Sequence, residues 1–255
     1  MSTEIRIRRI QKALGVRPDG VIGPETLSAL ESRLEIATSP SATSLECSMT
    51  SLTEIVKFEV SSRANYEKTL QRATWPGGQS GVTIGIGYDL GMTARKQIEA
   101  DWAGHIADAD LTALLVAQGV TGLAAATLAR SLSAVVIPFD VAELVFYQKT
   151  LPRYARDTRT TYPGVQALPA DAQGMFLSLV YNRGTKLTGA SRTEMAALRP
   201  LVRAGIAKLG AMADQFEAMR RLWPDVPGLL ARRRREAQIV RDSRRVYAPA
   251  ELVRL

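Results

Sequence analysis

Residues 81–91, with the sequence GVTIGIGYDLG, constrain the fold more than any other stretch of this chain. Side chains of a strand point to alternate faces with a period of two, which divides the stretch into two sets. One set is apolar and predicts a core face: Val82, Ile84, Ile86 and Tyr88. The other has little bulk between two oxygen-bearing side chains: Thr83, Gly85, Gly87 and Asp89.

The separation of Thr83 from Asp89 depends on whether this strand is straight. A straight strand would hold the two residues roughly 20 Å apart, at about 3.3 Å per residue. Gly85 and Gly87 permit a turn, because glycine adopts positive φ at little cost. A turn would bring Thr83 and Asp89 into one site, whereas the alternative is a glycine-rich hairpin that merely bends.

The chain is long and apolar enough to be globular, with 255 residues of which 46% are hydrophobic. It could form one large domain, or a small domain and a large one. No apolar run approaches about twenty residues, so we expect no membrane span. The charged start MSTEIRIRRIQKALG lacks the apolar core of a signal peptide, so we expect synthesis in the cytoplasm without a cleaved leader.

Two residue types limit the available chemistry. The single cysteine, Cys47, excludes an internal disulfide framework and a thiolate zinc cluster, and its Ser/Thr-rich surroundings argue against a nucleophile. The single histidine, His105, argues against a Ser-His-Asp site and against a zinc site with several imidazoles. Any chemistry must therefore rest mainly on carboxylates, hydroxyls, amides and arginine.

The formal net charge of +8 favours an anionic partner, such as nucleic acid, an anionic lipid surface or an acidic cell-wall polymer. The run Arg232-Arg233-Arg234-Arg235 resembles a nucleic-acid patch. Four consecutive helical residues turn through more than one full turn, however, and do not share a face. No row of aromatic stacking residues accompanies them, so we expect one or two arginines to pair inward and no nucleic-acid partner.

The first residues predict a small helical domain. Apolar residues recur at helical spacing on both sides of a turn at Pro18-Asp19-Gly20. The pattern Gln11-x-x-Leu14-Gly15, then Asp19-Gly20-x-x-Gly23-Pro24-x-Thr26, resembles the short peptidoglycan-binding repeat found beside many cell-wall hydrolases. This resemblance makes residues 1–36 a peptidoglycan-binding domain in which Gln11 and Asp19 contact the cell wall, although the two residues could simply cap and turn. Residues 37–50 then predict a linker.

A helix predicted from Ser51 carries a carboxylate on its apolar side. Ser51-Leu52-Thr53-Glu54 has the form of a capping box, and Glu59 falls on the stripe of Leu52, Ile55 and Val56. Burial disfavours the charged form of a carboxyl group, so Glu59 could stay protonated and act as a general acid. The alternative is that Glu59 lies at a frayed helix end and pairs with Arg63.

The remaining sequence is mainly helical and is punctuated by proline. In DAQGMFLSLVYNRGTK, Asn182 followed by Gly184 predicts the end of a core helix that presents an amide. Asn182 either contacts a substrate or caps the helix. The fold class is therefore mainly α, with a small β-hairpin.

Four motifs in succession resemble those of the phage-type lysozymes, the muramidases of bacteriophage endolysins, and of their pesticin-like relatives. The motifs are Phe58-Glu59, Thr83-Ile84-Gly85-Ile86-Gly87, Tyr181-Asn182-x-Gly184, and Gly228-Leu229-x-x-Arg232-Arg233 with Glu236. The resemblance covers roughly residues 51–245, and places a catalytic domain at residues 51–255. The succession is more specific than any one motif.

The resemblance implies a helix-rich, lysozyme-like α+β fold with a hairpin beside a cleft. It also implies cleavage of the β-1,4 bond between N-acetylmuramic acid and N-acetylglucosamine, without a metal ion or an organic cofactor. Glu59 would be the general acid. A second carboxylate would activate a water molecule or stabilise the oxocarbenium-like state, with Thr83 helping to hold the water. Tyr88 and Asn182 would contact the substrate.

The second carboxylate is where the chain departs from the commonest phage pattern. That pattern has an aspartate nine residues after the catalytic glutamate, but Lys68 occupies this position. In the pesticin-like pattern the aspartate follows the threonine by six residues, which gives Asp89. We therefore expect Asp89 to be the second carboxylate, with Glu67 as the alternative.

The whole sequence predicts a modular, monomeric cell-wall lysin that acts on bacterial peptidoglycan in the periplasm or cell wall. Its positive charge could also bring it to an anionic membrane or outer-membrane surface. A phage endolysin and an injected antibacterial effector fit the sequence equally well. The alternatives are a lytic transglycosylase and a non-catalytic, basic protein that binds the wall or a membrane.

Overall fold

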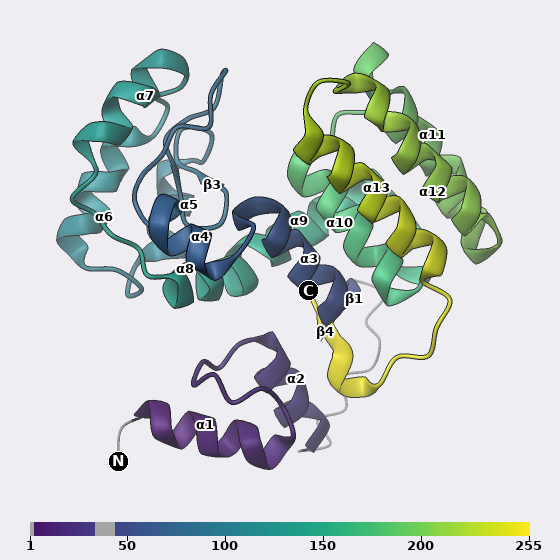
Figure 1. The fold of residues 1–255 in the computed structure, drawn as a ribbon, viewed down its shortest axis with the longest axis horizontal. Coiled ribbons are helices and arrows are strands. Elements are labelled where there is room, and N and C mark those ends of the chain that lie inside the picture. Colours follow the sequence, from purple (N-terminus) through teal and green to yellow (C-terminus); the bar gives the residue numbers. More distant parts are fainter. Residues whose placement is uncertain (1–2, 34–43) are drawn as a thin grey trace. The chain divides into compact units, whose positions relative to one another are not determined.

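The computed structural model describes residues 3–33 and 44–255. The chain divides into two compact units: unit 1 takes the residues up to Ile55 and again from Leu151, and unit 2 takes Val56–Thr150. The described residues form a mainly α structure with two small two-stranded sheets (Figure 1). This agrees with the predicted helix-rich class. Among these residues, no helix is both long and apolar enough to cross a membrane.

Unit 1 consists of helices and one short antiparallel sheet. Its helices are α1 (Thr3–Leu14), α2 (Pro24–Arg33), the start of α3 (Met49–Val60), α9 (Leu151–Thr161), α10 (Ala170–Arg183), α11 (Thr193–Arg203), α12 (Leu209–Ala218) and α13 (Pro227–Asp242). Its 3₁₀ turns are η4 (Val165–Ala167), η5 (Ala190–Arg192), η6 (Gly205–Lys208), η7 (Met219–Leu222) and η8 (Pro249–Glu251). Strand β1 (Glu46–Ser48) pairs with β4 (Leu252–Arg254).

Helix α10 forms the centre of unit 1. Every residue from Ala170 to Val180 is buried, as expected for a helix covered on all sides. Helix α13 contacts both α10 and α12, and α12 contacts α11 (Figure 1). The α10 sequence was predicted to be a core helix, and this prediction is confirmed.

The beginning of α3 differs from the prediction. The helix begins at Met49 because Ser48 is its N-cap: the Ser48 Oγ accepts a hydrogen bond from the Ser51 backbone N–H at 3.0 Å. Ser51 is thus the third residue of the helix and not its cap. Residues 44–50, predicted as the end of the linker, therefore form strand β1 and the start of α3, while residues 37–43 lie outside the described residues.

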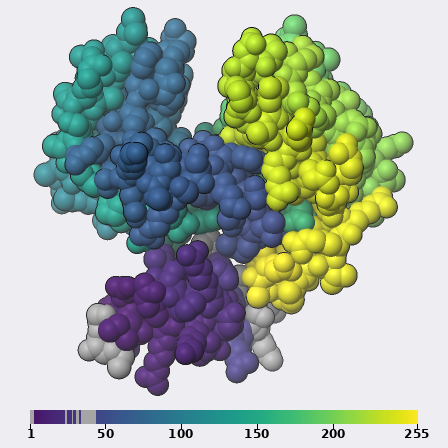
Figure 2. All heavy atoms as spheres, viewed as in Figure 1, coloured from purple at the N-terminus to yellow at the C-terminus, as the bar shows by residue number. Residues whose placement is uncertain are grey.

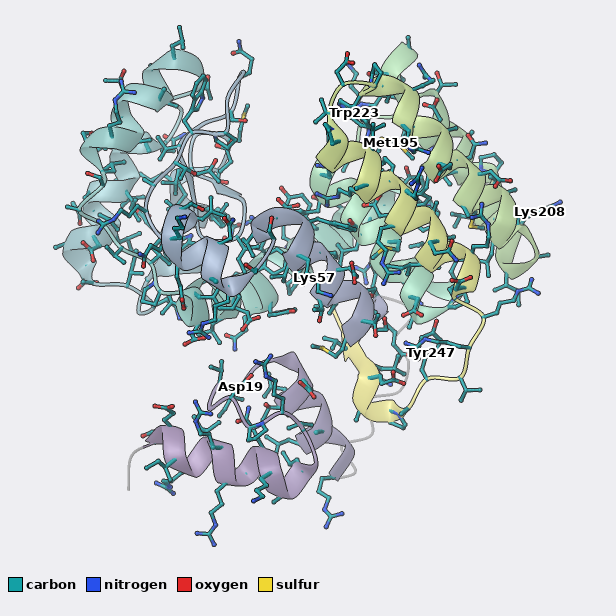
Figure 3. All side chains as sticks on the ribbon, viewed as in Figure 1. Asp19, Lys57, Met195, Lys208, Trp223 and Tyr247 are labelled. Carbon is teal, nitrogen blue, oxygen red and sulfur yellow. The ribbon has the colours of Figure 1, made fainter. Side chains whose placement is uncertain are left out.

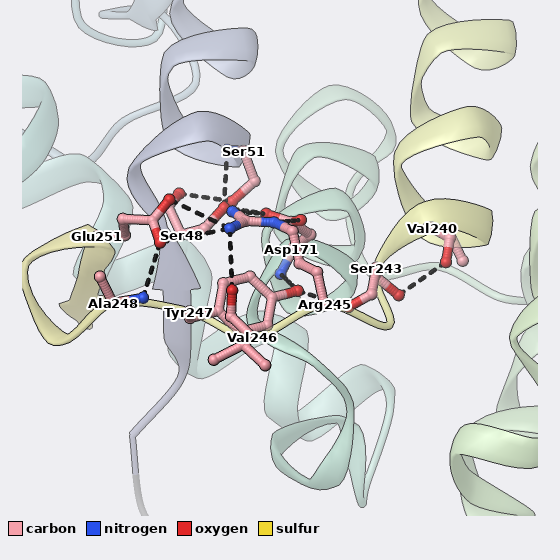
Figure 4. A network of polar contacts seen from close by, with 10 residues as sticks. All are labelled: Ser48, Ser51, Asp171, Val240, Ser243, Arg245, Val246, Tyr247, Ala248 and Glu251. Carbon is pink, nitrogen blue, oxygen red and sulfur yellow. Dashed lines mark hydrogen bonds and ion pairs between the residues drawn. The ribbon is translucent and has the colours of Figure 1, made fainter.

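A buried carboxylate joins the C-terminal residues to the rest of unit 1 (Figure 4). The Ser48 hydroxyl donates a hydrogen bond to Asp171, which is 6% exposed, and Arg245 Nε donates to Asp171 Oδ2 at 2.8 Å. The same guanidinium pairs with Glu251 at 3.1 Å and lies over the Tyr247 ring at 4.2 Å. Through these contacts the final residues, yellow in Figure 2, lie on the surface of unit 1.

The arginine run on α13 is half buried and half exposed. Arg232 and Arg233 are 5% and 0% exposed, and the two arginines that follow are exposed. Glu236 Oε1 accepts hydrogen bonds from the Ser178 hydroxyl at 2.6 Å, from Arg233 at 2.8 Å and from Arg232 at 3.2 Å. The prediction that one or two arginines pair inward is confirmed, because helical geometry turns this part of the run toward α10.

Unit 2 contains short helices and the predicted hairpin. Its elements are the end of α3, α4 (Arg63–Asn65), the π-helix η1 (Tyr66–Leu70), β2 (Thr83–Ile84), β3 (Tyr88–Asp89), α5 (Arg95–Trp102), α6 (Asp108–Leu114), η2 (Leu115–Ala117), α7 (Gly122–Ser131), α8 (Phe139–Val145) and the π-helix η3 (Phe146–Thr150). The predicted domain boundary at residue 51 does not coincide with the division between the two units.

Close packing of α3 on α10 gives the first prediction. A Cβ added at Gly174 would overlap the Ser51 side chain, so Gly174→Ala should destabilise the protein by about 1–3 kcal/mol through overpacking. Gly210→Ala on α12 is the control, since no atom lies within 4 Å of the added Cβ. That variant should be neutral or stabilise by about 0.4–1 kcal/mol. Denaturant unfolding measures both, and equal effects of the two variants would contradict the packing argument.

Candidate functional site

The stretch 81–91 forms a hairpin. Strands β2 and β3 are antiparallel, with Thr83 opposite Asp89 and Ile84 opposite Tyr88. The turn between them contains Gly85 and Gly87, whose φ angles of 57° and 67° favour glycine. The prediction that the glycines turn the chain is confirmed, because a straight strand could not place Thr83 opposite Asp89.

The register also sets how closely the Thr83 and Asp89 side chains approach. The Leu90 N–H donates to the Val82 carbonyl at 2.8 Å, while the N–H and carbonyl of Thr83 bond to Thr74 on the other side. Thr83 and Asp89 are therefore a non-hydrogen-bonded pair, in which facing Cβ atoms lie about 4.5–5.5 Å apart. Both residues are half-buried. A hydroxyl and a carboxylate thus lie side by side on one face.

Thr74 is a third oxygen-bearing residue on this face. It forms an antiparallel bridge with Thr83, with backbone hydrogen bonds of 2.8 and 2.9 Å, and bridge partners point their side chains to the same face. Thr74, in the segment RATWPGGQSG that precedes β2, was not among the predicted site residues. The available signal was the turn sequence Pro76-Gly77-Gly78, which predicts a hairpin between Thr74 and Thr83.

Backbone amides hold the Asp89 carboxylate in place. Oδ2 accepts from the Gly81 N–H and Oδ1 accepts from the Met92 N–H, each at 2.9 Å. A Cβ at residue 81 would overlap Oδ1, so only glycine allows this approach. Each carboxylate oxygen has a second lone pair and can still accept a hydrogen bond from water. Asp89 therefore organises the hairpin, and this role is compatible with a chemical one.

The other face of the hairpin is the predicted core face. Val82, Ile84, Ile86 and Tyr88 are all at most 3% exposed. The Tyr88 hydroxyl donates to Asp101 Oδ2 at 2.7 Å, and its ring meets Trp102 edge-on with centroids 5.4 Å apart. A side chain buried in this way cannot contact a glycan, so the structure does not support the predicted substrate contact of Tyr88. The period-two alternation explains why: Tyr88 shares the core face and not the face of Asp89.

Glu59 lies in the last turn of α3 and is half-buried, on the stripe whose other members are buried. The alternative interpretation paired Glu59 with Arg63. Arg63 instead pairs with Glu67 at 2.8 Å and with Asp140 at 2.7 Å. Glu59 and the Thr83–Asp89 pair belong to the same compact unit, and Glu67 is an exposed partner of Arg63. The choice of Asp89 over Glu67 stays a prediction.

Asn182 belongs to unit 1, in the last turn of α10. The helix ends at Arg183, and Gly184 follows with a φ of 71°, so Gly184 terminates the helix. Asn182 itself is exposed, and its Oδ1 lies 3.4 Å from Arg233 Nη2. Its role as a substrate contact stays a prediction.

In the N-terminal helical pair, Gln11 is a structural residue. It is 1% exposed, and its amide nitrogen donates to Asp19 Oδ1 at 2.7 Å and to Thr26 Oγ1 at 2.9 Å. Its amide oxygen accepts from the Gly20 N–H at 2.8 Å, and Asp19 Oδ1 also accepts from the Val21 N–H at 2.9 Å. A buried Gln11 cannot contact the cell wall directly, so the pattern residues fix the turn between α1 and α2.

The residues set aside in the sequence analysis remain outside this site. Cys47 is fully buried, which raises the pKa of its thiol and argues against a nucleophile. His105 is half-buried in the segment between α5 and α6. Within residues 3–33 and 44–255, no group of three or more His, Cys, Asp or Glu side chains is arranged to hold a metal ion.

The two bonds to Asp89 give the second prediction. In Asp89→Asn one backbone N–H must face an amide NH₂ group, so we expect a loss of about 1–3 kcal/mol in unfolding free energy. Glu67→Gln is the matched control, and it should cost at most about 1 kcal/mol because its ion pair is exposed. Denaturant unfolding measures both. An unchanged midpoint for Asp89→Asn would show that the two amides do not stabilise the hairpin through this carboxylate.

Comparison with known proteins adds no family to this description. The chain matches no protein-family model, and a search of curated proteins finds no significant match either.

Proposed function

We propose that this protein is a peptidoglycan hydrolase of the lysozyme type, a muramidase with an N-terminal wall-binding domain. The observation that carries the proposal is the cross-strand pair of Thr83 and Asp89, which presents a hydroxyl beside a carboxylate. The same compact unit supplies a half-buried glutamate, Glu59. Acid-assisted glycoside hydrolysis requires two carboxyl groups, and the Thr83 hydroxyl adds a group that can hold the attacking water.

In this proposal each residue has one role. Glu59 donates a proton to the glycosidic oxygen as the bond to the leaving sugar breaks. Thr83 and Asp89 hold a water molecule, which attacks the anomeric carbon and passes its proton to the Asp89 carboxylate. The two backbone amides that bind Asp89 fix the direction of its remaining lone pairs, so the water is positioned before the reaction.

Two other functions remain as alternatives. A lytic transglycosylase uses one acidic residue and closes the sugar on itself without water. The Thr83–Asp89 pair favours hydrolysis, because a carboxylate beside a hydroxyl can hold and activate a water molecule, which a transglycosylase does not need. A non-catalytic protein that adheres to walls or membranes by charge would need neither the pair nor Glu59.

The third prediction identifies the reaction products. Digested peptidoglycan should carry reducing N-acetylmuramic acid ends, which mass spectrometry distinguishes from the 1,6-anhydro ends of a transglycosylase by one water molecule. Glu59→Gln should abolish these ends, with a loss of at least about 100-fold in rate, since general acid catalysis contributes about 10²–10⁴-fold. Anhydro ends would contradict the proposal of a hydrolase. Cleavage within the peptide stems would exclude a glycosidase. Equal clearing of cell suspensions by Glu59→Gln would indicate binding by charge alone.

The fourth prediction tests the wall-binding domain. A chain of residues 44–255 keeps β1, which pairs with β4, so the cut must lie before Ser44. We expect this chain to lose most of its retention on insoluble peptidoglycan and to keep its turnover on solubilised fragments, because tethering raises the effective concentration without changing the catalytic groups. A co-sedimentation assay measures the first and reducing-sugar release the second. Equal retention of the full chain and the 44–255 chain would contradict the assignment of the N-terminal residues as a wall-binding domain.

A further inference from the structure

Two arginines of unit 1 converge on one uncharged atom. Arg183, at the end of α10, and Arg192, at the end of η5, each donate a hydrogen bond to the Met195 sulfur, through Nε and Nη1 and at 3.3 Å in both cases. A thioether sulfur is a weak acceptor with no charge to neutralise a guanidinium. Both arginines are half-buried.

Among the described residues, the carboxylate of Glu194 lies near this cluster and is hydrogen-bonded to a third arginine. Glu194 accepts from Arg221 through both of its oxygens, one of these bonds at 3.1 Å. Within the described part of the chain, neither Arg183 nor Arg192 forms an ion pair. Burial lowers the pKa of Arg183 to about 10, the charges of Arg192 and Arg233 lower it further, and the charge of Glu194 raises it, so the guanidinium stays charged at neutral pH.

The Arg183 side chain is held in one orientation by its neighbours. The Arg183 guanidinium lies over the Trp223 ring at 4.5 Å, and its Nη2 donates to the Ser191 carbonyl. Figure 3 labels Met195 and Trp223, which lie at the same end of the helices of unit 1. Stacking and hydrogen bonding thus fix the plane of the guanidinium, so less side-chain entropy is lost when a ligand binds.

We propose that Arg183 and Arg192 form a binding site for a carboxylate group. Each guanidinium has a fork of N–H groups, some of which are used by Met195 and Ser191. Among the described residues, Nη1 of Arg183 has no acceptor. The same holds for Nε and Nη2 of Arg192. A carboxylate accepts two parallel N–H bonds from such a fork. An anion between the two arginines would also relieve their repulsion.

The peptide stems of peptidoglycan are the source of this carboxylate. This identification rests on the proposed function, whereas the binding of a carboxylate does not. Asn182, the predicted substrate contact, immediately precedes Arg183 at the exposed end of α10. The site would therefore recognise the peptide of a muropeptide, and a bare N-acetylglucosamine oligomer would not engage it.

Calorimetric titration of the full chain tests the site directly. All titrations use the Glu59→Gln background, so that no probe is hydrolysed. The probes are N-acetylmuramoyl-L-alanyl-D-glutamate, citrate and a neutral N-acetylglucosamine oligomer. Arg192→Gln should weaken binding of the muramoyl peptide at least about tenfold, as expected for the loss of the charge-assisted hydrogen bonds of one guanidinium. Binding of the oligomer should not change. Arg192→Lys keeps the charge but loses the fork, and it should recover only part of the affinity.

The matched control is Arg234→Gln, which removes the same charge from an exposed position on α13. Equal losses in Arg192→Gln and Arg234→Gln would overturn the site in favour of general charge attraction, as would unchanged binding in Arg192→Gln. Citrate binding that depends on Arg192, without binding of the muramoyl peptide, would keep the carboxylate site and remove the peptide stem as its source. An unchanged unfolding midpoint for Arg192→Gln would show that the loss is not a loss of fold. The reaction products play no part in this test, so its failure is distinguishable from failure of the muramidase proposal.

Discussion

One oxygen of Glu236 organises the centre of unit 1. It accepts hydrogen bonds from two buried guanidinium groups of its own helix and from the Ser178 hydroxyl of α10. Burying three ionised groups is costly unless they pair, so α13 keeps a single orientation on α10, the one in which these bonds form. Removing the glutamate alone would leave Arg232 and Arg233 buried without this partner. This contact also helps to position Arg183, at the end of α10, and Trp223, just before the start of α13.

Asp171 and Asp89 also connect separate segments through hydrogen bonds to their carboxylates. Asp171 joins β1 and α10 to the C-terminal residues through Arg245, and Asp89 joins the two sides of the hairpin through backbone amides. Each carboxylate has several acceptor sites, but Asp171 binds residues that are distant in the sequence, whereas Asp89 binds amides only three and eight residues away. A carboxylate in this protein is therefore no sign of catalysis by itself. Asp89 differs from the other two because its neighbour across the strand is Thr83, and both are half-buried.

Short sequence patterns predicted the parts of the fold that backbone geometry within one segment determines. Alternation and the glycines at 85 and 87 predicted the hairpin and its core face, and helical geometry predicted the inward arginines, because each follows from backbone geometry alone. Gln11 and Tyr88, predicted to contact ligands, are buried, and the partners of their side chains come from other elements. The early start of α3 was missed for a similar reason: Ser48 is set in place by β1 and Asp171. The Arg183–Arg192 cluster depends on contacts that no short pattern contains.

The distribution of positive charge matters more than its sum. The net charge of +8 favoured an anionic partner, yet several arginines are engaged by carboxylates: Arg63, Arg221, Arg232, Arg233 and Arg245. Charges paired in this way attract little from a distance, and exposed charges are screened beyond about 8–10 Å at physiological salt. Arg183 and Arg192 are half-buried, lack an ion pair in the described residues and lie close together, so their attraction for a bound carboxylate is screened much less. A general excess of charge brings a protein to any anionic surface, whereas two fixed guanidinium forks select the geometry of one group. In the proposed function, adhesion would therefore depend on the net charge and recognition on the Arg183–Arg192 cluster.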